Sequence, residues 1–316
     1  MRIRVLGSAA GGGFPQWNCN CRHCESLRAG TFAGKSRTQT QVAISNDDRT
    51  WFLLNTSPDL RAQIEATPAL HPRNAGRDSP ICGVLLTSGD IDQIAGLLSL
   101  RELQPFRIYC TPSIRRILQE DNSVFRMLNR VPDQVSWTEI SSDGSFPLLT
   151  VAGNDSGIGC TVFSLGSRYP AYVSRERTAS LKPEEALLGL IVESSSGGRF
   201  AHMPAVPAVD DSLLQRLEGA DLLLFDGTFW SDDELIRVQG SGSTAREMGH
   251  IPVSGAEGSL RRLAGLRRPR KVFVHVNNTN PMLDESGPEY REVCAAGWEV
   301  GEDGWSLDLE SGNLKS

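Results

Sequence analysis

Histidine is scarce in this sequence, and this scarcity limits the metal chemistry open to the chain. Only five His occur among 316 residues, against seven Cys. Imidazole is the usual nitrogen ligand of zinc and non-haem iron in proteins. Any metal site must therefore take its nitrogen ligands from a short set. That set is His23, His71, His202, His250 and His275.

Long apolar segments and an excess of positive charge are also missing. No apolar run approaches the ~20 residues that a membrane helix needs, and the first residues lack the apolar core of a secretory signal. The 38 Asp and Glu outnumber the 32 Lys and Arg, which gives a net charge of −6. This balance disfavours a broad basic face for nucleic acid and an electrostatic membrane anchor. We therefore expect a cytoplasmic protein with neither nucleic-acid nor membrane partners.

The apolar pattern predicts an α/β fold. Hydrophobic residues make up 39% of the chain, which is enough for a substantial core. Strand-like runs alternate with helical patterns over the whole length, and no linker or repeat divides it, so we predict one domain over residues 1–316. Strands are expected at 3–6, 40–44, 51–55, 83–87, 107–110, 161–165, 188–193, 200–203, 221–225, 271–276 and 305–309, and helices at 94–100, 112–122, 254–266 and 288–296.

Three of the seven cysteines are clustered in a loop at about residues 11–25. Cys19, Cys21 and Cys24 form a C-x-C-x-x-C pattern, in which three thiolates can bind one soft cation and leave a fourth tetrahedral position for a distant ligand. The alternative is three buried thiols without a metal, which the clustering disfavours. The other cysteines are isolated, and this distribution favours reduced thiols over disulfides. We predict a structural zinc site in the loop.

Two carboxylates follow a predicted buried strand. Asp90 and Asp92 come after residues 83–87, and Gln93 follows them at the start of a predicted helix. Carboxylates at the carboxyl end of a strand, next to a helix N-terminus, lie where clefts form in α/β folds. The alternative is that one of the two acids caps the helix.

A further acid and two of the five histidines occupy comparable positions. Asp226 comes at the end of one predicted strand, His275 lies at the end of another, and His250 is in a loop before a predicted helix. The alternative for a lone His at a strand end is a hydrogen-bonded structural role, which is more frequent than metal binding. For His202 we favour the structural role.

Taken in order along the chain, these segments resemble the metallo-β-lactamase superfamily. Residues 88–93 (Ser-Gly-Asp-Ile-Asp-Gln) fall where the superfamily carries its H-x-H-x-D-H motif, and Asp226, His250 and His275 fall where its later site segments lie. More specifically, the chain resembles the coenzyme PQQ synthesis protein B family over nearly its whole length. The matching segments are 11–21 with Cys24, 55–61, 91–102, 226–234, 248–250 and 275–281.

The resemblance implies an αβ/βα sandwich of two mixed sheets with its site at the strand ends. It also implies a part in the biosynthesis of pyrroloquinoline quinone (PQQ), a redox cofactor made from a peptide that contains Glu and Tyr. The implied activity is that of an oxidoreductase, an iron-dependent hydroxylase of the tyrosine-derived ring of the crosslinked Glu–Tyr precursor. The alternative is a carrier for transport of PQQ or its precursor towards the periplasm, and a zinc hydrolase is a second alternative. The precursor would be the small-molecule partner, other PQQ pathway proteins are further expected partners, and a homodimer stays open.

The resemblance also implies which residues act. Asp92 and His275 would hold the active-site metal, expected to be Fe²⁺, because carboxylate and imidazole are the usual ligands of non-haem iron. His250 would act as a general acid or base beside it. The other candidates at this site are Asp90, Gln93, Asp226 and His202.

The positions at which the chain departs from the superfamily pattern bear on the choice between hydroxylase, carrier and hydrolase. Ser88, Asp90 and Gln93 replace three imidazoles, which disfavours a dizinc hydrolase. In a sibling phosphodiesterase family, the fourth ligand of the cysteine-bound zinc is a His at the position of Asn278, so His275 or a water is the alternative ligand here. PQQ is a tricarboxylate, so a carrier of PQQ would need Lys or Arg side chains in contact with it. The default interpretation of such side chains is that they are solvated at the surface. The candidate contacts are Lys35, Arg37 and Arg101.

Overall fold

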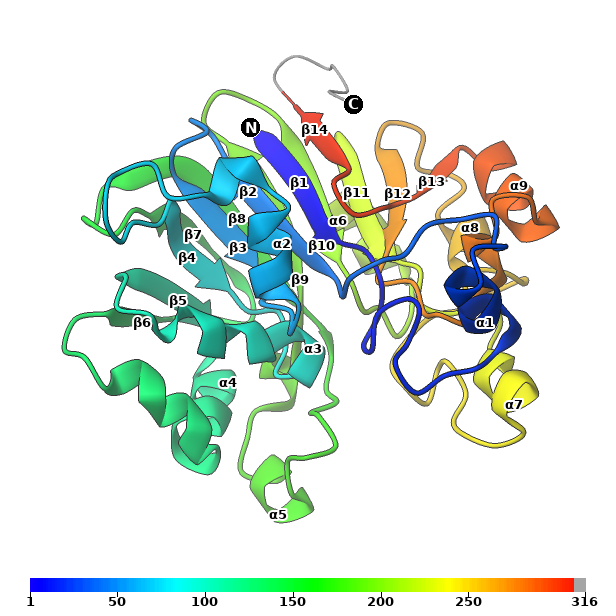
Figure 1. Ribbon diagram of the computed structural model, residues 1–316, viewed down its shortest axis with the longest axis horizontal. Coiled ribbons are helices and arrows are strands. Elements are labelled where there is room, and N and C mark those ends of the chain that lie inside the picture. The colour runs from blue at the N-terminus through cyan, green and yellow to red at the C-terminus, as the bar shows by residue number, and fades with distance from the viewer. Residues whose placement is uncertain (310–316) are drawn as a thin grey trace. The chain divides into compact units, whose positions relative to one another are not determined.

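The computed structural model describes residues 1–309 (Figure 1). These residues divide into two compact units. The first unit consists of residues 1–6, 41–198 and the described part from residue 304 onward. The second unit consists of residues 7–40 and 199–303. Residues 310–316, which the predicted domain includes, lie outside the described residues. The single domain over residues 1–316 stays a prediction.

Within residues 1–309 the strands form two seven-stranded sheets, and both are mixed. The order in the first sheet is β14 (Ser306–Asp308), β1 (Arg2–Gly7), β2 (Gln41–Ser45), β3 (Trp51–Leu54), β4 (Ile81–Leu85), β5 (Phe106–Cys110) and β6 (Val135–Glu139). The order in the second sheet is β13 (Trp298–Val300), β12 (Arg270–Val274), β11 (Leu222–Asp226), β10 (Arg199–Met203), β9 (Leu187–Ser194), β8 (Asp155–Gly166) and β7 (Gly144–Leu149). Neighbours are parallel from β3 to β6 and from β10 to β13, and antiparallel from β7 to β9. The predicted pair of mixed sheets is confirmed.

In the first unit, helices bury their apolar residues against the central strands. Every residue of β2 and β3 is buried, as is typical of strands whose alternating side chains enter two covered faces. Leu60, Ile94 and Ile114 belong to the same hydrophobic core as residues of β3, β4 and β5. These three residues lie on α2 (Leu60–Glu65), α3 (Ile91–Ile94) and α4 (Pro112–Arg116), and a further short helix is α5 (Arg175–Thr178).

The helix predicted around residues 94–100 is divided into α3 and the 3₁₀ helix Ala95–Arg101. Gly96 explains the tight packing of this segment, because a Cβ there would lie 2.3 Å from the Ser57 backbone oxygen. The Gly96 N–H donates to the Thr56 carbonyl oxygen at 3.0 Å. Glycine permits this close approach of two backbones, and the approach fixes the segment that follows Gln93.

In the second unit, the carboxyl ends of the parallel strands share one edge of the sheet. Asp226 ends β11 and pairs in register with Val274, the last residue of β12. Asp226 and His275 are therefore neighbours at this edge, although they are far apart in the sequence. The helices of this unit are α1 (Arg22–Arg28), α6 (Asp211–Leu217), α7 (Glu234–Gln239), α8 (Ser259–Arg262) and α9 (Pro288–Ala295).

The helix predicted over residues 254–266 forms only as α8, so its predicted extent is wrong. Gly255 has a positive φ of 92°, which is not helical. A Cβ at Gly258 would lie 2.1 Å from the Ser254 backbone oxygen. The two glycines thus hold a compact turn where the apolar periodicity alone predicts helix. Among all the described residues, no helix is both long and apolar enough to cross a membrane.

Candidate metal and catalytic sites

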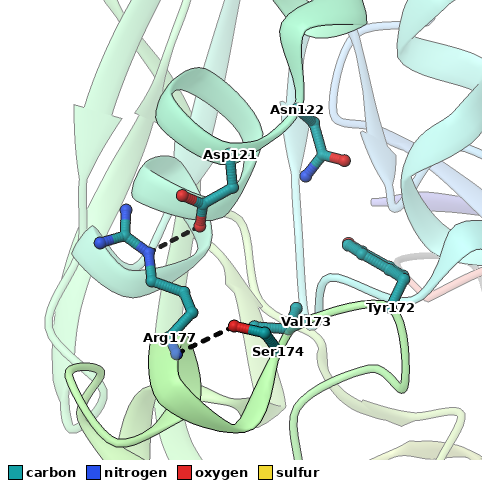
Figure 2. A pocket seen from close by; sticks show the side chains of 6 residues that line it. All are labelled: Asp121, Asn122, Tyr172, Val173, Ser174 and Arg177. Carbon is teal, nitrogen blue, oxygen red and sulfur yellow. Dashed lines mark hydrogen bonds and ion pairs between the residues drawn. The ribbon is translucent and has the colours of Figure 1, made fainter.

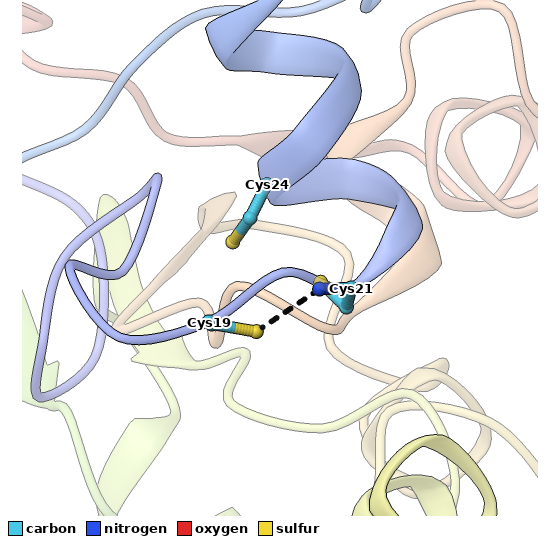
Figure 3. Close-up of side chains that lie close together, drawn as sticks. All are labelled: Cys19, Cys21 and Cys24. Atoms are coloured by element: carbon cyan, nitrogen blue, oxygen red, sulfur yellow. Dashed lines mark hydrogen bonds between the residues drawn. The ribbon is translucent and has the colours of Figure 1, made fainter.

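The three clustered cysteines of the second unit converge on one point (Figure 3). Their sulfur atoms all lie within 4.8 Å of one another. Cys21 is the N-cap residue of α1, so Cys24 falls in the first turn of the helix, where it is buried, and Cys19 lies on the preceding loop. The start of a helix thus folds the C-x-C-x-x-C segment back on itself. Three sulfurs in this arrangement can hold one soft cation.

The side-chain amide of Asn278 faces these three sulfurs. Its nitrogen lies 3.2 Å from Cys19 Sγ, 3.6 Å from Cys21 Sγ and 3.3 Å from Cys24 Sγ. Asn278 is buried in the loop after β12. Rotation of the amide about its terminal bond exchanges nitrogen for oxygen. Asn278 therefore lies at the position where a fourth ligand is expected, and its oxygen can serve as one.

Asp226, His250 and His275 form a second cluster in this unit, and all three are buried. One ligand-type atom from each lies within 4.8 Å of the others. His250 Nδ1 is 2.9 Å from Asp226 Oδ2, and the two imidazole rings stack with their centroids 5.3 Å apart. His275 has a positive φ of 58°, a strained conformation of the kind that clusters at functional sites. His275, which the sequence offers as an alternative fourth ligand of the cysteine-bound zinc, thus lies in this second cluster.

The Asp226 carboxylate is surrounded by hydrogen-bonding groups. Its Oδ1 accepts from the Thr228 backbone N–H at 3.0 Å and from the Thr228 hydroxyl at 2.6 Å. Its Oδ2 accepts from the Val206 N–H at 2.8 Å and is 2.9 Å from His250 Nδ1. A carboxylate offers about four lone-pair positions, and these four contacts occupy them. Asp226 in this arrangement orients its neighbours, as residues just outside a metal's ligand set do.

Sequence reasoning does not single out Thr228, although it lies within this cluster. The signal that could have found it is the spacing Asp226-Gly-Thr228, since an Asp side chain often accepts hydrogen bonds from the residue two positions further on. The hydroxyl at that position adds a second donor to the same carboxylate oxygen.

His202 lies on β10 of the same unit and differs from the other buried histidines. It is completely buried, and within residues 1–309 neither of its ring nitrogens has a hydrogen-bond partner. Burial, and to a smaller extent the nearby His275, lower the pKa of His202 to about 3. The ring is therefore neutral at physiological pH, which agrees with the structural role that we favour for it.

In the first unit, Asp90, Asp92 and Gln93 lie together after β4 and at the start of α3. Asp90 is at the N-cap position, yet its side chain accepts no capping hydrogen bond. It accepts instead from the Ser88 hydroxyl at 2.8 Å. The Gln93 amide nitrogen donates to Asp92 Oδ2 at 2.9 Å. The capping alternative therefore does not account for Asp90, and both carboxylates are held by polar neighbours.

A second polar segment supports this loop. Asn55 has a positive φ of 65°, which Asn tolerates better than most residues. Its amide nitrogen donates to Thr87 Oγ1 at 2.9 Å, and its amide oxygen accepts from the Thr87 N–H at 2.8 Å. The Thr56 N–H donates to the Gln93 carbonyl oxygen at 2.7 Å. These bonds fix both ends of the loop, a role that the sequence did not reveal.

Tyr172 contacts the same loop from within the first unit. Its hydroxyl donates to the Gly89 carbonyl oxygen at 2.5 Å, and the residue lines a cavity of about 260 Å³ (Figure 2). The cation in the cavity wall, Arg177, is paired with Asp121 at 2.7 Å and with Glu120 at 2.6 Å. The positive charge of Arg177 is thus paired with carboxylates of the same unit. The Tyr172 hydroxyl is a further contact that sequence reasoning missed.

The three cations considered as anion contacts all have structural partners. Arg37 is buried and donates to a backbone carbonyl oxygen. Lys35 forms an exposed ion pair with a glutamate, and Arg101 donates to a carbonyl oxygen three residues earlier in its own helix. These contacts favour structural roles for the three side chains.

The predicted site residues fall into two groups. The first unit contributes Asp90, Asp92 and Gln93, and the second contributes Asp226, His250 and His275. The metal predicted at Asp92 and His275 takes one ligand from each group, and it stays a prediction.

Comparison with known proteins identifies the class to which this fold belongs. Residues 50–276 match the family model of the beta-lactamase superfamily domain. A crystal structure of a diphosphatase from the PhnP family aligns over 99% of this chain and 99% of that chain, with a TM-score of 0.65. Its 18% sequence identity shows a shared fold and no more. The chain is a member of the metallo-β-lactamase superfamily.

Within that superfamily, the similarity narrows to one family. Coenzyme PQQ synthesis protein B from Methylobacterium sp. (strain 4-46) is 43% identical over 309 residues, which are 98% of this chain and 100% of that protein. The protein of the same name from Pseudomonas entomophila (strain L48) is 44% identical over 310 residues, with the same coverage. The crystal structure of Zn²⁺-bound PqqB from Methylobacterium extorquens has 43% identity and a TM-score of 0.89, over 98% of this chain and 100% of that chain. The chain belongs to the coenzyme PQQ synthesis protein B family, as the resemblance predicts.

Proposed function

We propose that this protein takes part in PQQ biosynthesis as an iron-dependent hydroxylase of the tyrosine-derived ring of the crosslinked Glu–Tyr precursor. The pathway is supported by relatives at 43% and 44% identity that are named for coenzyme PQQ synthesis. The reaction class is supported by one observation: the buried imidazole of His275, a ligand type that suits iron, stacks on the buried imidazole of His250, which can transfer protons. Cytoplasmic location, a homodimer and contacts with other pathway proteins remain predictions.

In this proposal, Asp92 and His275 hold the iron, since a carboxylate and an imidazole suit Fe(II). When bound, the iron supplies the redox chemistry with O₂ that ring hydroxylation needs. The Gln93 amide, which donates to Asp92 Oδ2, keeps the carboxylate in one orientation. The Nδ1 atom of His250 is paired with Asp226, so its other ring nitrogen, Nε2, is the atom that holds or releases a proton.

We also propose that Cys19, Cys21 and Cys24 bind a structural zinc, with the Asn278 side chain as the fourth ligand. The convergence of the sulfurs and the amide supports this assignment. The zinc in the crystal structure of the Methylobacterium extorquens relative supports the choice of metal. Four protein ligands around one zinc stabilise a loop and leave no position for substrate, so this site is separate from the chemistry.

Metal analysis and O₂ uptake of anaerobically prepared protein test the hydroxylase proposal. Asp92→Ala should lose its iron and at least about tenfold of its precursor-dependent O₂ consumption, because a ligand is removed, while it keeps its zinc. Glu65→Ala removes an exposed carboxylate of α2 and is the matched control. Unchanged iron content and turnover in Asp92→Ala would show that the hydroxylase assignment is wrong.

A carrier of PQQ or its precursor is the alternative, and one observation favours it. Ser88, Asp90 and Gln93 stand at three imidazole positions of the superfamily motif, and a neutral amide binds Fe(II) weakly. Calorimetry with the precursor distinguishes the two functions. Binding by iron-loaded protein without O₂ consumption would support the carrier, whereas O₂ consumption on binding would support the hydroxylase.

A further inference from the structure

The hydroxyl of Thr228 lies at the centre of the buried cluster of Asp226, His250 and His275. Its oxygen is 2.6 Å from Asp226 Oδ1, 2.8 Å from His275 Nδ1 and 3.1 Å from His250 Nδ1. Thr228 is only 2% exposed, so these side chains are its immediate surroundings. One hydroxyl is therefore within hydrogen-bond distance of all three members of the cluster.

The Thr228 backbone is fixed from two directions, which gives the hydroxyl a definite position. Its N–H donates to Asp226 Oδ1 at 3.0 Å, and its carbonyl oxygen accepts from the Asn277 N–H at 3.0 Å. The Asn280 amide nitrogen also donates to the Gly227 carbonyl oxygen at 2.9 Å. These bonds join the loop after β11 to the loop after β12. The backbone bonds thus fix the Cβ of Thr228, and the contacts of the hydroxyl with Asp226 and the two imidazoles select its rotamer.

The number of protons determines the direction of each hydrogen bond. A hydroxyl donates one proton and accepts through two lone pairs. The Asp226 carboxylate can only accept, so the Thr228 proton goes to Oδ1 over the 2.6 Å contact. The Thr228 oxygen then presents only lone pairs to His275 Nδ1, which must carry a proton to bond with it. His250 Nδ1 lies between this oxygen and Asp226 Oδ2, two acceptors, so it too must carry a proton.

We propose that Thr228, together with Asp226, is a positioning residue that holds both imidazoles in the Nδ1–H form. A neutral imidazole with its proton on Nδ1 has its lone pair on Nε2. The Nε2 atoms of His250 and His275 are then the atoms that bind a cation or accept a proton. The tautomer assignment is independent of the proposed function. A role of the Nε2 atoms in catalysis rests on the proposed function.

Nitrogen NMR of the full chain with ¹⁵N-labelled histidine tests this assignment directly, because the ring nitrogen shifts distinguish Nδ1–H from Nε2–H. At a pH where both rings are neutral, His250 and His275 should both show the Nδ1–H pattern. A proton on Nε2 of His275 in the wild-type chain would overturn the proposal, whatever the variants show.

Two variants then isolate the hydroxyl. Thr228→Val replaces it with a methyl group of similar size and should convert His275 into a mixture of both tautomers, while His250 keeps its Nδ1 proton through Asp226. Thr228→Ser keeps the hydroxyl and should restore the wild-type spectrum. Thr31→Val, at an exposed position of the same unit, is the matched control. An unchanged His275 tautomer in Thr228→Val contradicts the proposal.

Separate readouts keep this inference distinct from the proposed function. Iron content and O₂ uptake test the hydroxylase, whereas the ring-nitrogen spectrum requires no iron. An Nδ1–H spectrum in a protein that neither binds iron nor consumes O₂ would support the tautomer assignment and overturn the hydroxylase. If Thr228→Val does not fold, Thr228→Ala removes the hydroxyl without adding a buried methyl group, and the wild-type spectrum still decides the assignment.

Discussion

The two residue clusters of the second unit are assembled in different ways. The three thiols of the cysteine cluster all come from the short segment 19–24, and Asn278 is its one distant member. Asp226, His250 and His275 come from three separate segments, which meet because β11 and β12 lie side by side. Local spacing therefore specifies the first cluster, whereas the pairing of strands specifies the second.

The clusters also differ in how well their polar groups are satisfied without a cation. The sulfurs accept from the Asn278 amide nitrogen, and Cys19 Sγ also accepts from the Cys21 backbone N–H at 3.4 Å. Sulfur is a weak hydrogen-bond acceptor. The carboxylate and hydroxyl of the second cluster form a continuous network of short bonds. We therefore expect the cysteine cluster to depend on a bound cation for its stability, whereas hydrogen bonds within the second cluster stabilise that cluster.

The largest effect that tests this comparison is expected for Cys24→Ser. The variant should lose its bound zinc and on the order of 3 kcal/mol or more of unfolding free energy, because metal binding and folding of such a loop are coupled. Zinc content and thermal unfolding measure the two losses.

Cys294→Ser is the matched control, because Cys294 is an exposed thiol on α9 of the same unit. It should keep the zinc and the wild-type unfolding temperature. Asn278→Ala should retain zinc more weakly than the wild type, since one ligand of four is removed. Full zinc content and stability in Cys24→Ser would show that the clustered cysteines do not bind the zinc.

Asp226→Asn should have an intermediate effect. The amide keeps the size of the side chain but replaces an acceptor oxygen with a donor, so at least one buried N–H or O–H loses its partner. We expect the unfolding free energy to fall by about 2 kcal/mol, measured by urea unfolding of the zinc-loaded protein.

Asp211→Asn, at a position whose side chain is 93% exposed, should change stability little and serves as the control. If Asp226→Asn is as stable as this control, the network around Asp226 does not stabilise the second cluster. The two clusters would then not differ in whether hydrogen bonds stabilise them without a cation.

The smallest effect at neutral pH is expected for His202→Leu. His202 is buried without hydrogen bonds, so an apolar residue should stabilise the fold by about 1 kcal/mol at pH 7. The folded pKa of about 3 lies below the ordinary 6.5, so only the unfolded chain binds a proton between these values. Wild-type stability should therefore fall as the pH falls from about 6.5 towards 3, and the variant should lack this contribution.

Urea unfolding at a series of pH values measures the difference between wild type and variant. His71→Leu, which removes an imidazole outside the buried core, is the matched control. A parallel pH dependence in wild type and His202→Leu would show that folding does not lower the pKa of His202.

Most of the strands could be predicted, and the three that were missed have a common cause. β6, β7 and β13 each lie at the edge of a sheet. An edge strand has one neighbour and is often less buried, so its apolar pattern is weaker. β6, for example, has no buried residue. The helix predicted at residues 254–266 failed for the opposite reason, because its apolar spacing is helical but two glycines interrupt the backbone.

By itself, the sequence determined the cysteine cluster, the α/β class and the family resemblance, because each depends on spacing along the chain. The tertiary structure alone decided that the Asn278 amide faces the sulfurs and that the Thr228 hydroxyl joins three side chains. It also decided that His202 is buried without a partner. These contacts join residues far apart in the chain, and their geometry follows from strand pairing and loop packing, which no local pattern records.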